Sequence, residues 1–279
     1  MFINYSCRWG IRDQFCNKVT ASLSQRNMEL VDRDNKILVS GCDIDGIARG
    51  KILNSSKFKH IENGFGFCNV IFGWDCHDAV YEPKTPGMIN DPGFADILAK
   101  VDLSTFRRCP LSGTPHYVVE FFNPLTQQPL PYCPRSLLRK SLSIMPEYTC
   151  LTGVEFEFFN YKETSDSLHA KKGTNLTPLT TGMFGYSLAR PAVYQEYFDE
   201  IYNGALAFKI PLECYHTETG LLLVFLNQLM TIYKGPGVYE AAIEYADTLE
   251  LCDRAHLFKL LTKKIGAKRK IIGNQAYLL

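Results

Sequence analysis

The amino-acid sequence predicts a mixed α+β fold, and three observations support this prediction. The stretch Val154–Phe159 alternates side chains with the period of two that is typical of a β-strand. The pair Asp45-Gly46 lies between two apolar residues and favours a tight β-hairpin turn. Helical patterns begin near Pro134 and Pro191, where a proline is suited to the first turn of a helix.

Composition limits the size of the fold and the classes of partner. A chain of 279 residues with 46% hydrophobic residues can form one large domain or two smaller ones. The net charge of +1 gives no overall attraction to nucleic acid or to an anionic membrane, so neither partner is expected. The ten cysteines contain no C-x-x-C spacing, which predicts reduced and mostly buried thiols. The first 22 residues carry charges and no apolar run, so a cytoplasmic protein without a secretory signal is expected.

The order of the expected elements follows from their period and from the turn residues between them. They are a strand at 37–40, a hairpin at 41–51, a short helix at 57–62, a strand with a tight loop at 64–75, a loop at 83–93, a strand at 116–122, a helix from Pro134, a strand at 154–159, a loop at 162–177, a helix from Pro191, and a strand followed by a long helix at 238–265. Side chains expected to face inward are Leu137, Leu138 and Leu142 in the first long helix, Val193, Tyr197, Ile201 and Leu206 in the second, and Leu249, Cys252, Leu257, Leu260 and Leu261 in the third.

The strand expected at 154–159 carries two carboxylates. Its alternation places Glu155 and Glu157 on one face, and Val154, Phe156 and Phe158 on the other. Two neighbouring carboxylates repel each other, and a divalent cation such as Mg²⁺ or Mn²⁺ would remove that repulsion. The same pattern fits a half-exposed strand with a solvated acidic face, so this stretch alone leaves both interpretations open.

A set of short motifs occurs in one order along the chain. They are Asp43–Gly46 with Arg49–Lys51, Gly64–Phe67, Phe72–Asp75, Asp102–Arg107, Cys133–Leu138, Glu155–Phe159, His216–Gly220 and Pro236–Glu240. Together they resemble the glutamine synthetase superfamily, and more closely its branch of type-I-like glutamine synthetases and γ-glutamyl-amine ligases. The resemblance covers residues 30–268 and ends there, which is typical of a C-terminally truncated member.

The resemblance implies a particular domain organisation. It predicts an N-terminal β-grasp domain at 26–120 and a partial catalytic domain at 121–268, in which helices accompany a curved antiparallel sheet. Residues 1–25 are then a disordered leader, and residues 269–279 are a divergent tail.

The resemblance also implies an activity. Members join ammonia or an amine to the γ-carboxylate of glutamate through γ-glutamyl phosphate, with ATP as co-substrate and Mg²⁺ or Mn²⁺ as cofactor. Glu155, Glu157, Glu218 and Glu240 match the metal-binding glutamates of the family. Asp75 matches a catalytic position in a loop that, in the family, closes the active site of a neighbouring subunit and helps to bind ammonium, so a homo-oligomeric ring is implied.

The chain departs from the family pattern after Gly220. Glu218 and Glu240 are twenty-two positions apart, and removal of Leu221–Gly235 would restore the family spacing of seven. We interpret this apolar segment as a translated intron or a gene-model error. The sequence therefore supports an amine ligase that is incomplete and inactive in this form, or a non-catalytic glutamine-synthetase-like subunit that assembles with full-length subunits. A non-functional product is a third alternative. His216 is either a residue that assists the site or a structural histidine.

Overall fold

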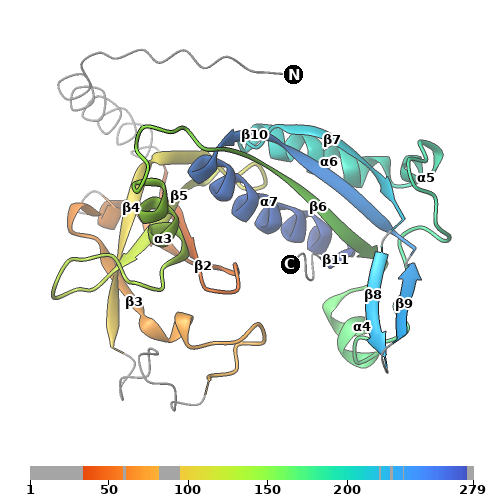
Figure 1. Ribbon diagram of the computed structural model, residues 1–279, viewed down its shortest axis with the longest axis horizontal. Coiled ribbons are helices and arrows are strands. Elements are labelled where there is room, and N and C mark those ends of the chain that lie inside the picture. Colours follow the sequence, from red (N-terminus) through yellow and green to blue (C-terminus); the bar gives the residue numbers. More distant parts are fainter. Residues whose placement is uncertain are drawn as a thin grey trace.

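The computed structural model describes residues 34–58, 61–81, 95–219, 221–226, 229–234 and 236–274, and it has a mixed α+β architecture (Figure 1). The α+β prediction is therefore confirmed. The expected leader at 1–25 and the expected loop at 83–93 lie outside the described residues. No helix in the described part of the chain is long and apolar enough to cross a membrane.

The first sheet contains the N-terminal strands in the order β2-β1-β5-β4-β3. Its strands are β1 Lys36–Cys42, β2 Ala48–Asn54, β3 Phe65–Cys68, β4 Asp96–Arg108 and β5 Pro115–Phe122. Strands β1 and β5 are parallel, whereas the other neighbours are antiparallel. Gly46 has a φ of +70° in the predicted turn between β1 and β2, a conformation that glycine adopts without steric cost.

Short helical segments replace parts of two predicted elements near this sheet. The helix expected at 57–62 is divided into α2 (Ser55–Phe58) and the 3-10 helix η1 (Ile61–Asn63). The strand expected from residue 64 ends at Cys68, after which the 3-10 helix η2 (Asn69–Phe72) turns the chain. The core under this sheet includes Ile37, Leu53, Phe65, Ile97 and Phe121.

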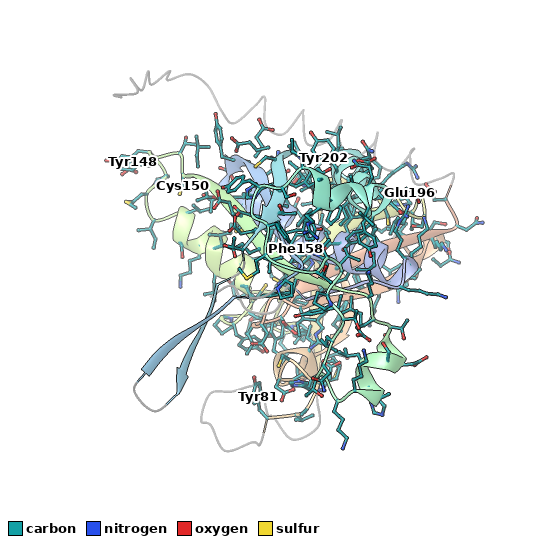
Figure 2. All side chains as sticks on the ribbon, turned by 90° about the vertical axis from the view of Figure 1, so that its right-hand side faces the viewer. Tyr81, Tyr148, Cys150, Phe158, Glu196 and Tyr202 are labelled. Atoms are coloured by element: carbon teal, nitrogen blue, oxygen red, sulfur yellow. The ribbon has the colours of Figure 1, made fainter. Side chains whose placement is uncertain are left out.

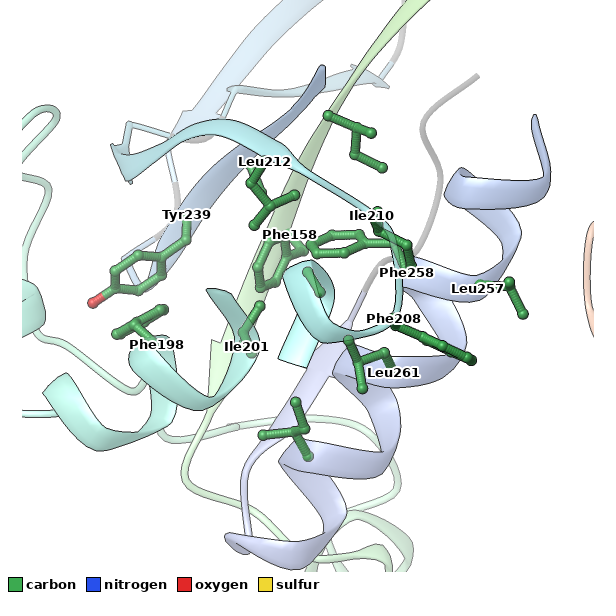
Figure 3. Packing of buried hydrophobic residues seen from close by; sticks show 14 of the residues in the cluster. Phe158, Phe198, Ile201, Phe208, Ile210, Leu212, Tyr239, Leu257, Phe258 and Leu261 are labelled. Atoms are coloured by element: carbon green, nitrogen blue, oxygen red, sulfur yellow. The ribbon is translucent and has the colours of Figure 1, made fainter. Parts of the chain in front are cut away.

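The second sheet is antiparallel and has the order β11-β6-β10-β7. Its strands are β6 Leu151–Tyr161, β7 Leu212–Glu218, β10 Val238–Asp247 and β11 Ile272–Asn274. The helices α6 (Gln195–Ala207) and α7 (Thr248–Lys268) cover one face (Figure 1). Figure 3 shows Phe158, Tyr239 and Leu212 from the strands packed against Ile201, Phe258 and Leu261 from these helices. Burial of such side chains contributes about 1.5–3 kcal/mol each, which holds the sheet and the helices together.

The remaining helices differ from expectation in detail. The polar segment expected to be a loop at 162–177 contains α4 (Ser165–Ala170), because the Thr164 and Ser167 side chains form a capping box. The helix expected from Pro191 is divided into α5 (Ala189–Ala192) and α6. Tyr197 and Ile201 are buried as predicted, but Val193 and Leu206 are exposed. Val193 lies at the break between the two helices, and Leu206 lies on the side of α6 opposite Tyr197.

In helix α3 (Pro134–Leu142), the leucines Leu138 and Leu142, which are expected to face inward, are half-buried, and two polar residues are buried more deeply. Leu137 is exposed, whereas Arg135 and Ser136 are buried. In α7, Leu257 and Leu261 are buried as predicted, but Cys252 is exposed. Arg135 is buried because carboxylates from other elements accept its hydrogen bonds.

The first sheet and helix α7 meet at an ionic junction formed by Arg135, Arg139, Asp102, Glu120 and Asp253. Arg135 donates two hydrogen bonds of 2.9 Å to Asp253 of α7, and its Nη2 lies 2.8 Å from Asp102 of β4. It also donates to Glu120 of β5, which accepts a second hydrogen bond of 2.7 Å from Arg139. Each carboxylate of this junction therefore has a guanidinium partner.

The segment Leu221–Gly235 contains a separate two-stranded hairpin. Strands β8 (Leu221–Leu226) and β9 (Leu229–Lys234) pair with each other, and within the described residues they pair with no other strand. The hairpin projects away from the body of the molecule in both ribbon views (Figures 1 and 2).

All eight described cysteines are free thiols, but the expectation that most are buried is wrong. Only Cys109 and Cys133 are buried, and Cys76, Cys150, Cys214 and Cys252 are exposed. The residues around the exposed thiols lie on loops and on outer strand or helix faces, so a cysteine there has no core to enter.

Candidate metal centre

Two glutamates and one histidine form a row across the second sheet. In the strand register, Glu240 of β10 lies opposite Glu157 of β6 on one side and opposite His216 of β7 on the other. Directly opposed residues in an antiparallel sheet share a face and lie about 5 Å apart at Cβ. Glu155 and Glu218 lie two residues along their strands from members of this row, so the period of two places them on the same face.

His216 lies between two of these carboxylates. Its Nδ1 is 3.8 Å from a Glu218 oxygen and its Nε2 is 3.7 Å from a Glu240 oxygen. One ligand atom from each of the three residues lies within 4.8 Å of the others, a grouping that can hold a metal ion. All three side chains are partly buried.

The electrostatics of the cluster favour a cation. Burial raises the pKa of Glu240 above its ordinary value, and the neighbouring Glu155, Glu157 and Glu218 raise it further, against the opposing effect of His216. Hydrogen bonds from Thr219 hold the pKa of Glu218 below its ordinary value. In the described part of the chain, no lysine or arginine forms an ion pair with these four glutamates.

A loop after the predicted metal strand covers His216. The Tyr186 ring stacks on the His216 ring with 4.2 Å between centroids. Thr217 fixes this loop, since its carbonyl accepts the Tyr186 N–H and its hydroxyl accepts the Ser187 N–H and donates to the Phe184 carbonyl. No pattern in the sequence predicts this contact, because it joins residues 30 positions apart through tertiary structure.

The apolar segment 221–235 does not displace Glu218 from the cluster. Glu218 pairs with Val238, so β7 and β10 keep the register of a hairpin. Removal of 221–235 would leave Thr219, Gly220, Pro236 and Gly237 as a connection of ordinary hairpin length.

Asp75 lies apart from the carboxylate cluster. Its carboxylate accepts the backbone N–H groups of His77 and Ala79, which lower its pKa from the ordinary value. Figure 2 shows Tyr81 of the same loop at the lower edge of the molecule, whereas Phe158 of β6 lies near the middle. Within one chain the structure does not bring Asp75 to the predicted metal ligands, and its catalytic role stays a prediction.

The donor set suits a hard divalent cation. Four carboxylates and one imidazole are the ligands that Mg²⁺ or Mn²⁺ and related ions accept from proteins. Glu155 and Glu157 are exposed on β6, whereas His216, Glu218 and Glu240 are partly buried and grouped. The metal role of the four glutamates stays a prediction.

Comparison with known proteins identifies the family. The model of the glutamine synthetase catalytic domain matches residues 131–273. The chain therefore belongs to the glutamine synthetase catalytic-domain family. All of the carboxylates in the cluster lie within the matched residues.

The individual relatives are glutamine synthetases and γ-glutamyl-amine ligases. Type-1 glutamine synthetase 2 of Dictyostelium discoideum is 41% identical over 89% of this chain, and glutamate–isopropylamine ligase of a Pseudomonas species is 29% identical over 83%. The aligned regions cover 45% and 48% of those two proteins, so the chain spans about half of their length. The solved structure of GmaS in complex with ADP shares the fold over 88% of this chain and 50% of its own, with a TM-score of 0.67 and 19% identity.

Proposed function

We propose that this chain belongs to an ATP-dependent ligase that joins ammonia or an amine to the γ-carboxylate of glutamate through γ-glutamyl phosphate. The cluster of carboxylates on adjacent strands, within the residues that match the catalytic domain, carries the proposal. The names of the relatives, which include an isopropylamine ligase, support an amine as the acceptor. The five-stranded N-terminal sheet is proposed to be the β-grasp domain, with the division near residue 120.

In this proposal Glu155, Glu157, Glu218 and Glu240 hold Mg²⁺ or Mn²⁺, and His216 lies within reach of the same site. The ions, when bound, neutralise phosphate charge and polarise the transferring group. The protein's own contribution is to fix the carboxylates on rigid strands, because ligands on a paired sheet need little reorganisation. Asp75 would act from the loop of a neighbouring subunit in a homo-oligomer.

The second candidate is a non-catalytic subunit that assembles with full-length subunits. The chain spans only about half the length of each relative, which supports this second candidate. Both candidates need the same fold, but only the first needs phosphoryl transfer.

The test measures ADP formation by the purified chain with Mg²⁺, glutamate and a panel of ammonia, alkylamines and polyamines. ADP that depends on both glutamate and an amine supports the ligase, and the preferred amine names its substrate class. Folded protein that binds Mn²⁺ but forms no ADP favours the non-catalytic subunit. A chain that neither binds Mn²⁺ nor turns over contradicts the metal assignment and the ligase together.

The matched control is Glu244→Gln against Glu240→Gln. Both glutamates lie on β10, but Glu244 is exposed and lies outside the cluster. Loss of Mn²⁺ binding in the Glu240 variant alone would locate the ion in the cluster.

A further inference from the structure

Residues 73–81 form a loop that is folded by its own hydrogen bonds. Trp74 and Val80 form an isolated β-bridge, and the Asp75 N–H donates to the Ala79 carbonyl at 2.9 Å. The Tyr81 N–H donates to the Gly73 carbonyl at 2.8 Å. These bonds shape the loop around Asp75, but they do not tie it to the first sheet.

Arg49 of β2 makes that connection. Its Nη2 lies 2.6 Å from the Asp78 carboxylate, and its guanidinium carbon lies 4.8 Å from the centre of the Trp74 ring. On the opposite side its Nε donates a 2.7 Å hydrogen bond to Asp43. Asp43 is itself buried and also accepts the backbone N–H groups of Asp45 and Ile47.

We infer that Arg49 is a positioning residue that holds the Asp75 loop where it can meet the ammonia or amine, and this inference rests on the function proposed above. One guanidinium joins a buried carboxylate of the sheet to both ends of the loop, through charge at Asp78 and through stacking at Trp74. The planar fork and flat face of arginine allow these contacts together, whereas lysine offers a single point charge. The Arg49 side chain is only 11% exposed, whereas that of Asp78 is 59% exposed, so the ion pair lies at the edge of solvent.

The first experiment measures amide hydrogen exchange across residues 73–81 in Arg49→Lys, Asp78→Asn and the double variant. Lysine keeps a positive charge beside buried Asp43, so the sheet stays folded. Asn tolerates the positive φ of Asp78, which is 61°. Either single change should speed exchange about five-fold, which is the effect of losing one partly exposed ion pair. The double variant should add little, because each single change already removes the same ion pair.

Asp45→Asn is the matched control, since Asp45 is an exposed aspartate of the same hairpin whose carboxylate makes no described contact with Arg49. It removes one negative charge from the same hairpin and should leave exchange in the loop unchanged. Equal acceleration in this control would mean that net charge, not the Arg49 contact, sets the loop stability.

The second experiment separates positioning from mere stability. In the assembly that forms ADP from ATP, glutamate and an amine, Asp78→Asn should raise the KM for the amine about five-fold. The KM values for glutamate and ATP should stay unchanged. Unchanged exchange in both single variants would overturn the inference that Arg49 holds the Asp75 loop. Faster exchange with an unchanged amine KM would overturn its role in amine binding. If the wild type forms no ADP in any assembly, the proposed function fails, and with it the amine role, while the exchange data still decide whether Arg49 holds the loop.

Discussion

Two groups of acidic side chains in this molecule have opposite surroundings. At the ionic junction between the first sheet and helix α7, Asp102, Glu120 and Asp253 are each paired with Arg135, and burial of this arginine is nearly complete. On the open face of the second sheet, Glu218 and Glu240 lie beside His216 without a lysine or arginine partner among the described residues. Both groups lie on strands and helices of the same fold, so secondary structure does not distinguish them.

The difference separates a structural cluster from the cluster that we propose binds a metal ion. A buried carboxylate must be neutralised, and the junction does this with guanidinium groups that are part of the chain. The open face leaves its charge to be neutralised from outside, and a divalent cation is the partner that its ligands suit. Four changes test this contrast.

The largest effect is expected from Arg135→Ala, which leaves three carboxylates at the junction without their shared guanidinium. We expect a loss of about 3–5 kcal/mol in the free energy of unfolding, because removal of one partner leaves buried charge uncompensated. Urea denaturation measures it. Arg139→Ala, whose side chain is 50% exposed, should cost about 1 kcal/mol or less. Equal losses in the two variants would contradict the contrast between buried and exposed partners.

The next effect concerns the open face. Glu157→Gln should weaken Mn²⁺ binding on the order of 100-fold, since a neutral amide replaces a charged ligand, with little change in stability without metal. Titration calorimetry with MnCl₂ measures the affinity, and Glu244→Gln serves as the control on a neighbouring strand. An unchanged affinity in the Glu157 variant would remove this residue from the metal site.

Acidification should act with opposite signs on a buried histidine pair and on Glu240. Near the junction, Ser40 lies 2.8 Å from His116 and 3.3 Å from His256. Burial lowers the pKa of His116 to about 3 and that of His256 to about 4, and the nearby Lys264, Arg107 and Lys259 add to this. Below the unfolded value of 6.5 the unfolded chain binds protons that the folded chain does not, so stability falls as pH decreases.

At pH 5 the expected loss is about 2 kcal/mol or less for each histidine. Glu240 acts in the opposite direction, because its raised pKa means that the folded state gains protons first as pH falls. Urea midpoints at pH 7 and pH 5 test this, and His256→Gln should reduce the difference between them. If the midpoints at pH 7 and pH 5 differ as much in His256→Gln as in the wild type, groups other than His256 determine the loss of stability at low pH.

The smallest effect is expected from deletion of Leu221–Gly235. The register of β7 and β10 places the cluster, and the four remaining connecting residues suffice for a hairpin, so stability should change by less than about 1 kcal/mol. Thermal unfolding and Mn²⁺ affinity of the shortened chain measure this. A large loss of affinity would mean that the β8–β9 hairpin supports the carboxylate cluster. Transcript sequencing across the codons for 215–239 tests separately whether the segment is a retained intron.

The sequence by itself determined the local part of this protein. The alternation at Val154–Phe159 specified β6 and one face for Glu155 and Glu157, because a strand has a period of two whatever surrounds it. The turn at Asp45-Gly46, the proline at the start of α3 and the family motifs were readable for the same reason, since each depends on a few adjacent residues.

Only the tertiary structure decided which distant residues meet. The pairing of β10 with both β6 and β7 brought Glu157, Glu240 and His216 into one row, and it kept Glu218 there despite the apolar segment. Helix α3 buried Arg135 and exposed Leu137 because three carboxylates from other elements surround that position. Strand register and charge compensation are long-range properties, and a pattern along the chain does not contain the partner that satisfies them.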